Sequence, residues 1–461
     1  MSTGAPWKGR KLHFVGIGGA GMSGLALIAR ALGAEVSGCD AVQTPYFEEL
    51  QAAGITPHVG HDVSHAQADT ELVVSTAIPA DLPEVAAARA QGTPVHHRGE
   101  LLAAAVAMRR VIAVAGTHGK TTTTAMIAHA LAECGESVGY AVGAELPLPG
   151  GGHKPNAVWG RGQWMVIEAD ESDRSFLNFE PEVAVLTNIE LDHHSTYASE
   201  LEVRAAFDEF LASVRSEGSV VAWEGAGVAT GLQFGLSPGA ALRARDVRPA
   251  GTGMQFTLVV DGEDVTGVTV PVPGEHNVLN ALAAIGAARA AGHDPARAAL
   301  ALASFQPAGR RFEAKGDVAG VRVFDDYAHH ATEVAATLAA ARALAPRRLV
   351  AVFQPHLYSR TAHTHDDLGR ALAGADVVMV LDVYRARERP EDYPGVGGEL
   401  VARSAADHAG GGEVWWLPTR DEAVGVLSHR LETGDVVVTL GAGDVDLVAT
   451  ALLDQLDGGS R

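Results

Sequence analysis

Cysteine is scarce in this chain of 461 residues, which contains only Cys39 and Cys134. Two cysteines this far apart fit a reducing compartment better than a disulfide framework. Long apolar runs are also missing, because no stretch reaches about 18 uninterrupted apolar residues, the length that a membrane span needs. The first ten residues hold no apolar signal core. We therefore expect a cytoplasmic protein without membrane insertion.

Positive charge is in short supply as well. The chain has 35 Lys and Arg residues against 56 Asp and Glu residues, so its net charge is −21. This balance excludes the basic surface of a nucleic-acid-binding protein. It does not exclude a bound nucleotide, because helix ends and a few cations can hold a phosphate locally. Length predicts about three domains, and we expect a monomer or a weak homodimer.

The most informative stretch is residues 111–131. Apolar β-branched residues lead into Gly116-Thr117-His118-Gly119-Lys120-Thr121-Thr122, and a helical pattern follows. This strand–loop–helix context favours a phosphate loop, in which backbone N–H groups and a helix N-terminus surround a phosphate. Lys120 would reach the terminal phosphates and Thr121 would ligate Mg²⁺. The spacing is tighter than the usual motif, which would need glycine in place of Val114, so an ordinary glycine-rich turn is the alternative.

A second glycine-rich loop lies near the N-terminus. The strand 12–15 precedes Gly16, Gly18 and Gly21, a helix follows over 22–31, and a strand over 34–38 leads to Asp40. This is the dinucleotide fingerprint, and it indicates a pyrophosphate at a helix N-terminus, which a nucleotide sugar carries as NAD does. Residues 75–77 follow a later strand, at a ligand-binding end of the sheet. His58, His61 and His65 lie in a polar loop without cysteine, so we do not predict a zinc site there.

Carboxylates and amides follow two strands of the middle region. Four acidic residues occur in the segment 168–173 after the strand 164–167, and this placement suits Mg²⁺. A solvated acidic loop is the alternative. Asn188 and His193 follow the strand 183–186. A hairpin is expected around Asp261-Gly262, and Asn277 and Asn280 lie on one face of a helix over 273–291, where they contact a nucleotide or cap the helix.

The C-terminal region again alternates strands and helices. Expected strands cover 321–324, 349–353, 377–383 and 436–440, and a helix covers 331–344. Asp, Tyr, His and Arg side chains gather at two successive strand ends. We therefore predict an α/β protein of three domains. These are a Rossmann-like domain (1–107), a central domain with a phosphate-loop, ATPase-like parallel sheet and a small antiparallel hairpin region (108–308), and a second Rossmann-like domain (309–461).

Four segments resemble the Mur ligase family: Gly116–Thr122, Glu168–Asp173, Asn188–His193 and Gly309–Phe312. Three more, at His13–Gly24, Asp325–His330 and Phe353–His356, are similar to the branch that adds L-alanine to UDP-N-acetylmuramate. The resemblance covers essentially the whole chain. It implies an ATP- and Mg²⁺-dependent ligase of peptidoglycan precursor synthesis. The sugar-nucleotide carboxylate would attack the ATP γ-phosphate, and L-alanine would then attack the resulting acyl phosphate.

The resemblance also assigns roles to residues. The catalytic set would be Lys120, Glu168, Asn188, His193 and Arg311, and the metal ligands would be Thr121, Glu168 and His193. ATP would contact residues 116–122 (Gly116, Thr117, His118, Gly119, Lys120, Thr121 and Thr122) with Asn277, Asn280, Arg311 and Asp326. The UDP substrate would contact Gly16, Gly18, Gly19, Ala20, Gly21, Met22, Ser23, Asp40, Ser75, Thr76, Ala77 and Arg98. The amino acid would contact Tyr327, His329, His356 and Arg360.

Two details qualify this assignment. Some family members use a carbamylated lysine after the Asn188–His193 segment, and no lysine occurs from Asn188 to Arg215, which agrees with the alanine-adding branch. Arg387 stands where the branch often has glycine. Four other functions remain open: a sister ligase that attaches a preformed peptide, a folylpolyglutamate synthase, an NAD-dependent oxidoreductase based on Gly16–Gly21 and Asp40, and a non-catalytic ATP-binding switch.

Overall fold

The computed structural model describes residues 5–65, 67, 69–147, 153–193 and 196–458. The chain folds into two compact units. The first comprises Met1–Arg245, Thr257–Val268 and Leu279–Gln306, and the second comprises Asp246–Phe256, Thr269–Val278 and Pro307–Arg461. Among the described residues, none of the helices combines the length and the apolar character that crossing a bilayer requires.

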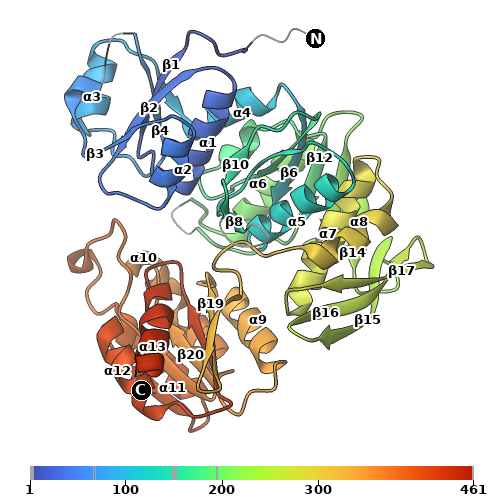
Figure 1. Cartoon of the computed structure of the whole chain (residues 1–461), viewed down its shortest axis with the longest axis vertical. Helices are drawn as coiled ribbons and strands as arrows, with labels where there is room; N and C mark the ends of the chain where they lie inside the picture. The colour runs from blue at the N-terminus through green and yellow to red at the C-terminus, as the bar shows by residue number, and fades with distance from the viewer. Residues whose placement is uncertain (1–4, 66, 68, 148–152, 194–195, 459–461) are drawn as a thin grey trace. The chain divides into compact units, whose positions relative to one another are not determined.

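The N-terminal part of the first unit contains a five-stranded parallel sheet (Figure 1). In the order β3-β2-β1-β4-β5, its strands are Pro57–Val59, Glu35–Asp40, Lys11–Val15, Glu71–Val74 and Val95–His97. The helices are α1 (Ala20–Ala31), α2 (Tyr46–Ala52), α3 (Pro83–Ala90) and α4 (Arg98–Val106). Side chains of α1, α2 and α4 pack with Leu12 and Phe14 on one face, and α3 packs on the other. Strand β2 is longer than predicted, because it includes Cys39 and Asp40.

A ten-stranded mixed sheet forms the middle of the chain, in the order β10-β7-β11-β6-β12-β13-β14-β15-β16-β17. In that order its strands are Ala157–Val158, Gly139–Ala141, Trp164–Glu168, Arg110–Ala115, Val183–Leu186, Ser219–Trp223, Leu232–Gly235, Leu242–Ala250, Gly253–Val260 and Glu263–Val270. The seven strands that are consecutive in the sheet from β7 to β15 pair in parallel, and β10 is antiparallel to β7. The predicted turn at Asp261-Gly262 joins β16 to β17 with φ of 50° and 90°, values that a type I′ hairpin turn requires.

The helices of this region are α5 (Lys120–Glu133), α6 (Glu200–Ala212), α7 (Glu275–Ala290) and α8 (Pro295–Ala301). Strands β8 (Leu146–Pro147) and β9 (His153–Lys154) form a separate antiparallel pair. Helix α5 begins at Lys120, earlier than the apolar pattern suggested. Its first residues are four threonines in succession after the lysine, all buried, so the helix has no polar face that hydrophobic periodicity could detect.

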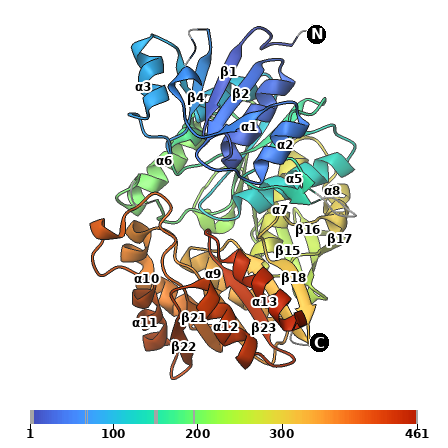
Figure 2. The ribbon, with the colours of Figure 1, turned by 60° about the vertical axis from the view of Figure 1, so that its left-hand side comes forward.

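The second unit is built on a six-stranded sheet in the order β18-β19-β23-β20-β21-β22 (Figure 2). In that order its strands are Glu313–Val318, Val321–Asp326, Val436–Leu440, Leu349–Phe353, Val377–Val380 and Glu413–Trp416. Only β18 is antiparallel, and the sequence pattern did not predict it. Helices α9 (Ala331–Arg342), α10 (Tyr358–Leu372) and α11 (Gly398–His408) cover one face, and α12 (Arg420–Arg430) and α13 (Asp446–Gly458) cover the other. This two-sided covering confirms the predicted α/β class.

Candidate functional site

The phosphate loop (residues 116–119) joins β6 to α5. Gly116 has φ of 135°, and a Cβ atom there would lie 2.0 Å from Thr187 Oγ1. Gly119 caps α5 with φ of 82°, and a Cβ atom there would lie 2.7 Å from Asn280 Oδ1. Both positions therefore require glycine. The predicted loop motif has the backbone geometry of an anion-binding turn at a helix N-terminus.

Lys120 lies across the mouth of this loop. Its Nζ donates to Gly116 O at 2.6 Å and Thr117 O at 3.1 Å, and it lies 2.8 Å from Glu171 Oε2. Burial favours the neutral amine, but Glu171 and Asp170 outweigh that effect and raise the pKa of Lys120. These contacts favour the charged form of Lys120 beside the phosphate loop.

The side chain of Asn188 holds the loop in shape. Its Oδ1 accepts from His118 N at 2.9 Å and its Nδ2 donates to His118 O at 3.0 Å. The neighbouring Thr187 Oγ1 donates to the same carbonyl at 2.6 Å. We predicted a catalytic role for Asn188. The geometry shows that its side chain positions the loop backbone.

The predicted metal ligands lie in α5, at the end of β11 and in the segment that follows β12. Thr121 is buried in the first turn of α5, and Glu168 ends β11, where its Oε1 accepts from Gly143 N at 2.7 Å. His193 has φ of 54°, and its Nε2 lies 3.3 Å from Glu171 Oε1. Hydroxyl and carboxylate oxygens beside a phosphate loop fit a hard divalent cation such as Mg²⁺.

Glu171 is the residue of this site that sequence reasoning missed. Its side chain is 2% exposed, and it contacts both Lys120 and His193. The acidic segment (residues 168–173) pointed to this region, but local spacing does not show which of its carboxylates turns inward. Tyr197 Oη also donates to the Glu171 carbonyl at 2.8 Å, so both the backbone and the side chain of Glu171 have partners.

Helix α7 carries the two predicted asparagines. Asn280 is buried, and its Oδ1 accepts from Thr123 Oγ1 of α5 at 3.1 Å. Asn277 Nδ2 donates to Pro273 O at 2.7 Å at the beginning of its own helix. Thus Asn280 lies beside the phosphate loop, whereas the side chain of Asn277 organises the helix start.

The glycine loop (residues 16–21) follows β1 and runs into the first turn of α1, which begins at Ala20, two residues earlier than predicted. Gly16 has φ of 81°, and a Cβ atom there would lie 2.9 Å from Ile78, so the turn after β4 (residues 75–78) packs against the loop. Asp40 Oδ2 accepts from Gly18 N at 2.9 Å. The Asp40 side chain therefore supports the glycine loop, and its predicted contact with the UDP substrate stays a prediction.

The helix start after the glycine loop offers mainly backbone to a ligand. Gly19 and Gly21 are exposed, and Ala20 is partly exposed. Met22 and Ser23 are buried, and Ser23 Oγ accepts from Asn156 Nδ2 at 3.0 Å. The side chains of these two residues therefore face the protein interior, and their backbone N–H groups donate to Gly19 O at 3.0 and 2.8 Å.

Arg98 connects the glycine loop with the acidic segment of the first unit. A Cβ atom at Gly21 would lie 3.0 Å from Arg98 Nη1, and Arg98 Nη2 donates to Asp170 Oδ2 at 3.2 Å and Asp173 Oδ2 at 3.4 Å. Burial opposes the charge of Asp170, but Lys120 and Arg98 more than offset it and lower its pKa. The two predicted substrate regions of this unit are thus linked by one guanidinium group.

In the second unit, the hinge segment (residues 309–312) is tied to the end of β19. Arg310 has φ of 58°, and its Nε donates to Asp325 Oδ2 at 2.9 Å. Its other nitrogens donate to the carbonyls of Gly443 and Gly441 at 2.8 and 2.7 Å. Asp326 accepts from Phe312 N and Ala328 N, both at 2.8 Å. Arg311 lies with its guanidinium 5.1 Å from the Tyr327 ring centroid.

We predict a pH-dependent stability that comes from Asp326. Burial raises its pKa to about 6, although Arg311 and two backbone amides favour the charged form. Because a raised carboxyl pKa stabilises the fold only while the group is protonated, this contribution is lost as pH rises through about 6. Between pH 5 and pH 7, the stability of wild type relative to Asp326→Asn should fall by about 1 kcal/mol.

Hydrogen exchange of the β19 backbone amides, corrected for intrinsic rates, would measure this change in the full chain. Exposed Asp317 lies in the adjacent strand β18 and serves as the control, because Asp317→Asn should show no pH-dependent difference. A constant difference between wild type and Asp326→Asn across this pH range would contradict the prediction.

The predicted amino-acid residues form a ring cluster in the second unit. The ring centroids of Tyr327 and His329 are 5.4 Å apart, and those of His329 and His356 are 6.0 Å apart. Tyr384, which the sequence analysis missed, stacks on His356 with centroids 5.8 Å apart. Arg360 lies in the first turn of α10, two residues after Tyr358. Tyr384 follows a strand end without any motif, so only the fold identifies it.

Arg387 does not need the conformation of the glycine that it replaces. The positive φ of its turn, 47°, falls on Ala386, and Glu388 N donates to Arg385 O at 2.8 Å. Arg387 itself is exposed. Glu388 also accepts from Ser359 N at 3.0 Å, which holds this loop to the start of α10.

Comparison with known proteins adds a family to this geometry. Three family models match: "Mur ligase family, catalytic domain" at residues 11–110, "Mur ligase middle domain" at residues 114–288, and "Mur ligase, glutamate ligase domain" at residues 310–443. A UDP-N-acetylmuramate–L-alanine ligase of Streptomyces coelicolor is 44% identical, with 99% of this chain and 100% of the relative covered. One from Kineococcus radiotolerans is 47% identical, with 97% and 96% covered.

Two solved structures have the same fold and more than a quarter of the sequence in common. UDP-N-acetylmuramate-alanine ligase of Thermotoga maritima matches with a TM-score of 0.83 and 28% identity, over 97% of this chain and 99% of that one. A murein peptide ligase of Psychrobacter arcticus matches with a TM-score of 0.72 and 28% identity, over the same shares.

Proposed function

Since this chain belongs to the Mur ligase family, we propose that it joins L-alanine to the carboxylate of UDP-N-acetylmuramate at the expense of ATP. The full-length relatives carry the name of that activity. The observation in the structure that supports it best is Lys120, which is held as a cation across a glycine-shaped loop at the start of α5. Such a loop binds polyphosphates rather than a nicotinamide cofactor.

The proposed chemistry has two steps. The sugar-nucleotide carboxylate attacks the γ-phosphorus of ATP, the bond to ADP breaks, and an acyl phosphate forms. The amine of L-alanine then attacks the acyl carbon, the bond to phosphate breaks, and the amine loses a proton. Catalysis of phosphoryl transfer is mainly positioning and charge stabilisation.

The residues of the phosphate loop supply the positive and hydrogen-bonding groups for the first step. Backbone N–H groups at the start of α5 hold the phosphates, and Lys120 balances the charge that develops on the transferred group. Thr121, Glu168 and His193 would hold Mg²⁺. Bound there, the ion would reduce the repulsion between the attacking carboxylate and the phosphate oxygens. From the second unit we assign Arg311 and Asp326 to the nucleotide.

We also propose binding sites for the two other substrates. We assign the UDP diphosphate to the backbone of the glycine loop and the turn at Ser75–Ala77, with Arg98 as the neighbouring cation. We assign L-alanine to the ring cluster of the second unit, where Arg360 would pair with its carboxylate in the bidentate manner that suits arginine. We further propose that the protein acts in the cytoplasm as a monomer or a weak homodimer.

We predict that His193→Ala lowers kcat and weakens the dependence of activity on Mg²⁺. The substitution removes a ligand from the proposed metal site, so more Mg²⁺ should be needed for half-maximal rate, by about 10-fold. His293, which pairs with Glu136 at 3.5 Å, provides the matched control, and His293→Ala should leave the Mg²⁺ profile unchanged. An unchanged profile in His193→Ala would remove His193 from the site.

The proposed function is tested by phosphate release from ATP and Mg²⁺ with UDP-N-acetylmuramate present and one acceptor added at a time: L-alanine, glycine, L-serine or a peptide. Release that requires both the sugar nucleotide and L-alanine would support the assignment. Release that responds only to a peptide would show a sister ligase. Release without any acceptor would indicate an ATP-binding switch, and NADH binding without release would indicate an oxidoreductase.

A further inference from the structure

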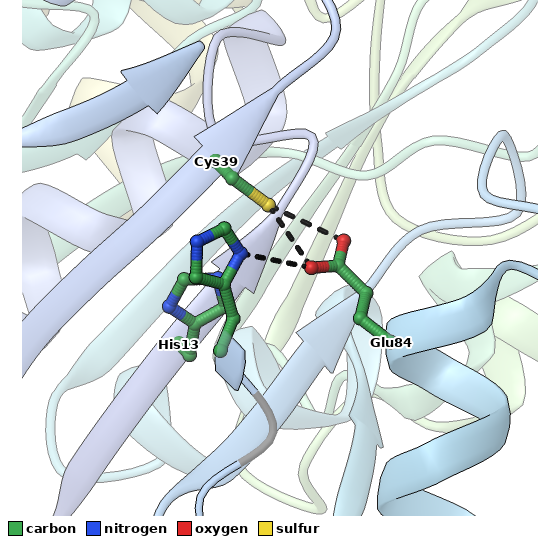
Figure 3. A group of neighbouring side chains, drawn as sticks. His13, Cys39 and Glu84 are labelled. Atoms are coloured by element: carbon green, nitrogen blue, oxygen red, sulfur yellow. Dashed lines mark hydrogen bonds and ion pairs between the residues drawn. The ribbon is translucent and has the colours of Figure 1, made fainter. Parts of the chain in front are cut away.

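A cluster of potential metal ligands lies in the N-terminal sheet, away from every role assigned above. One donor atom from each of His13, Cys39, His65 and Glu84 lies within 4.8 Å of every other. The residues come from β1, β2, the 3₁₀ helix Val63–His65 and α3. Figure 3 shows the labelled side chains of His13, Cys39 and Glu84 converging on one point. Tetrahedral zinc places its ligand atoms about 3.5 Å apart, so little movement is needed to bind an ion.

The orientation of His13 is the second observation that points to a ligand. Its Nδ1 lies 2.9 Å from Ser37 Oγ, which fixes the ring. Its Nε2 is buried, and it has no hydrogen-bond partner among the described residues. A hydrogen-bond partner on the far nitrogen is the usual arrangement of a ligating histidine.

The buried carboxylate of Glu84 needs a positive charge beside it. Its side chain is fully buried, and among the described residues it forms ion pairs with two histidines, His61 at 2.7 Å and His65 at 3.0 Å. Cys39 Sγ lies 3.3 Å from Glu84 Oε1. A buried carboxylate is costly unless a cation balances it. A divalent ion bound between these residues would supply that charge.

We propose that His13, Cys39, His65 and Glu84 form a structural site for zinc or a similar thiophilic divalent cation. Two imidazoles, a thiolate and a carboxylate make a four-ligand set of the kind that zinc takes in tetrahedral geometry. His61, whose Nδ1 lies 3.4 Å from Cys39 Sγ, would stay beside the site as a hydrogen-bonding neighbour. Cys39 O accepts from Gly16 N and Ile17 N at 2.8 and 3.0 Å, so the ion would stiffen the support of the glycine loop.

Cobalt binding to the full-length protein tests the proposal. After treatment with a chelator, the protein is titrated with Co²⁺ in the absence of ATP. We expect a thiolate-to-cobalt charge-transfer band that saturates at one equivalent and disappears when Zn²⁺ is added. Cys39→Ser should lack the band, and Cys134→Ser, which changes the other cysteine, should retain it. His193→Ala should also retain it, which separates this site from the phosphate loop.

Two further measurements guard against a variant that fails to fold. His65 is partly exposed, so His65→Ala should keep its circular dichroism spectrum while its zinc affinity falls at least 10-fold in competition with a chromophoric chelator. Zinc should raise the Tm of wild type but not that of His65→Ala. The proposal is overturned if wild type shows no thiolate band, if the band persists in Cys39→Ser, or if zinc affinity is the same in His65→Ala.

Discussion

Lys120→Ala should lower phosphate release by about 10³-fold while the binding of UDP-N-acetylmuramate stays nearly unchanged. The lysine is the cation of the phosphate loop. Its contacts among the described residues are with that loop and with Glu171, not with the glycine loop that we assign to the sugar nucleotide. Phosphate release under saturating substrates and calorimetric binding of the sugar nucleotide give the two readouts. Equal loss of both would show that Lys120 is structural.

A control is needed because Lys120→Ala leaves the buried carboxylate of Glu171 without its lysine partner. Glu171 is 2% exposed, and removing one partner of such a pair costs about 3–5 kcal/mol of stability. The double variant Lys120→Ala with Glu171→Gln removes that charge, so it should regain stability without regaining activity. Lys315→Ala changes a lysine that pairs with Glu313 at 3.2 Å in β18, and it should retain full activity. Recovery of activity in the double variant would contradict the catalytic role.

Arg310→Ala should destabilise the second unit by about 3–5 kcal/mol. It leaves Asp325, which is fully buried, without its guanidinium partner, and it leaves two glycine carbonyls without their donors. Burial raises the pKa of Asp325, and Arg310 works against that shift, so the variant should also take up a proton in the folded state. Hydrogen exchange of β19 and β23 in the full chain measures the loss locally.

Two other arginines of the second unit separate this effect from a general loss of positive charge. Arg347→Ala breaks an exposed pair with Glu432 and should change stability by less than about 0.5 kcal/mol. Arg311→Ala should raise the KM for ATP with little change in exchange protection, since we assign this residue to the nucleotide. Protection in Arg310→Ala that equals that of Arg347→Ala would show that the buried network contributes little.

The zinc site illustrates what sequence spacing could not reveal. The histidines at 58, 61 and 65 gave no reason to expect a metal, because their loop has no cysteine. The parallel register of β1 and β2 places His13 beside Ser37 and Val15 beside Cys39, and α3 brings Glu84 from farther along the chain. The four ligands therefore lie on four elements that are separated by loops, and no local motif joins them.

Within the phosphate-loop site, some roles were predictable from adjacent residues and others depended on the pairing of the strands. Gly116, Gly119 and Lys120 were predicted because their conformations and chemistry depend on adjacent residues. Glu171 and the clamp by Asn188 were not assigned their roles, because these depend on which side chains β11 and β12 turn toward β6. The catalytic role of Asn188 stays a prediction, and the structure adds that its side chain positions the loop backbone.

The sequence by itself determined the α/β class, the Mur ligase family, the glycine loop and the phosphate loop, because these depend on periodicity and on residues that are close along the chain. Strand β18, the ring contact of Tyr384, the inward carboxylate of Glu171 and the four-ligand cluster were decided only by the tertiary structure. Sheet pairing brings together residues that are far apart in sequence, and the energy of those contacts depends on distances and burial that no short stretch of sequence contains.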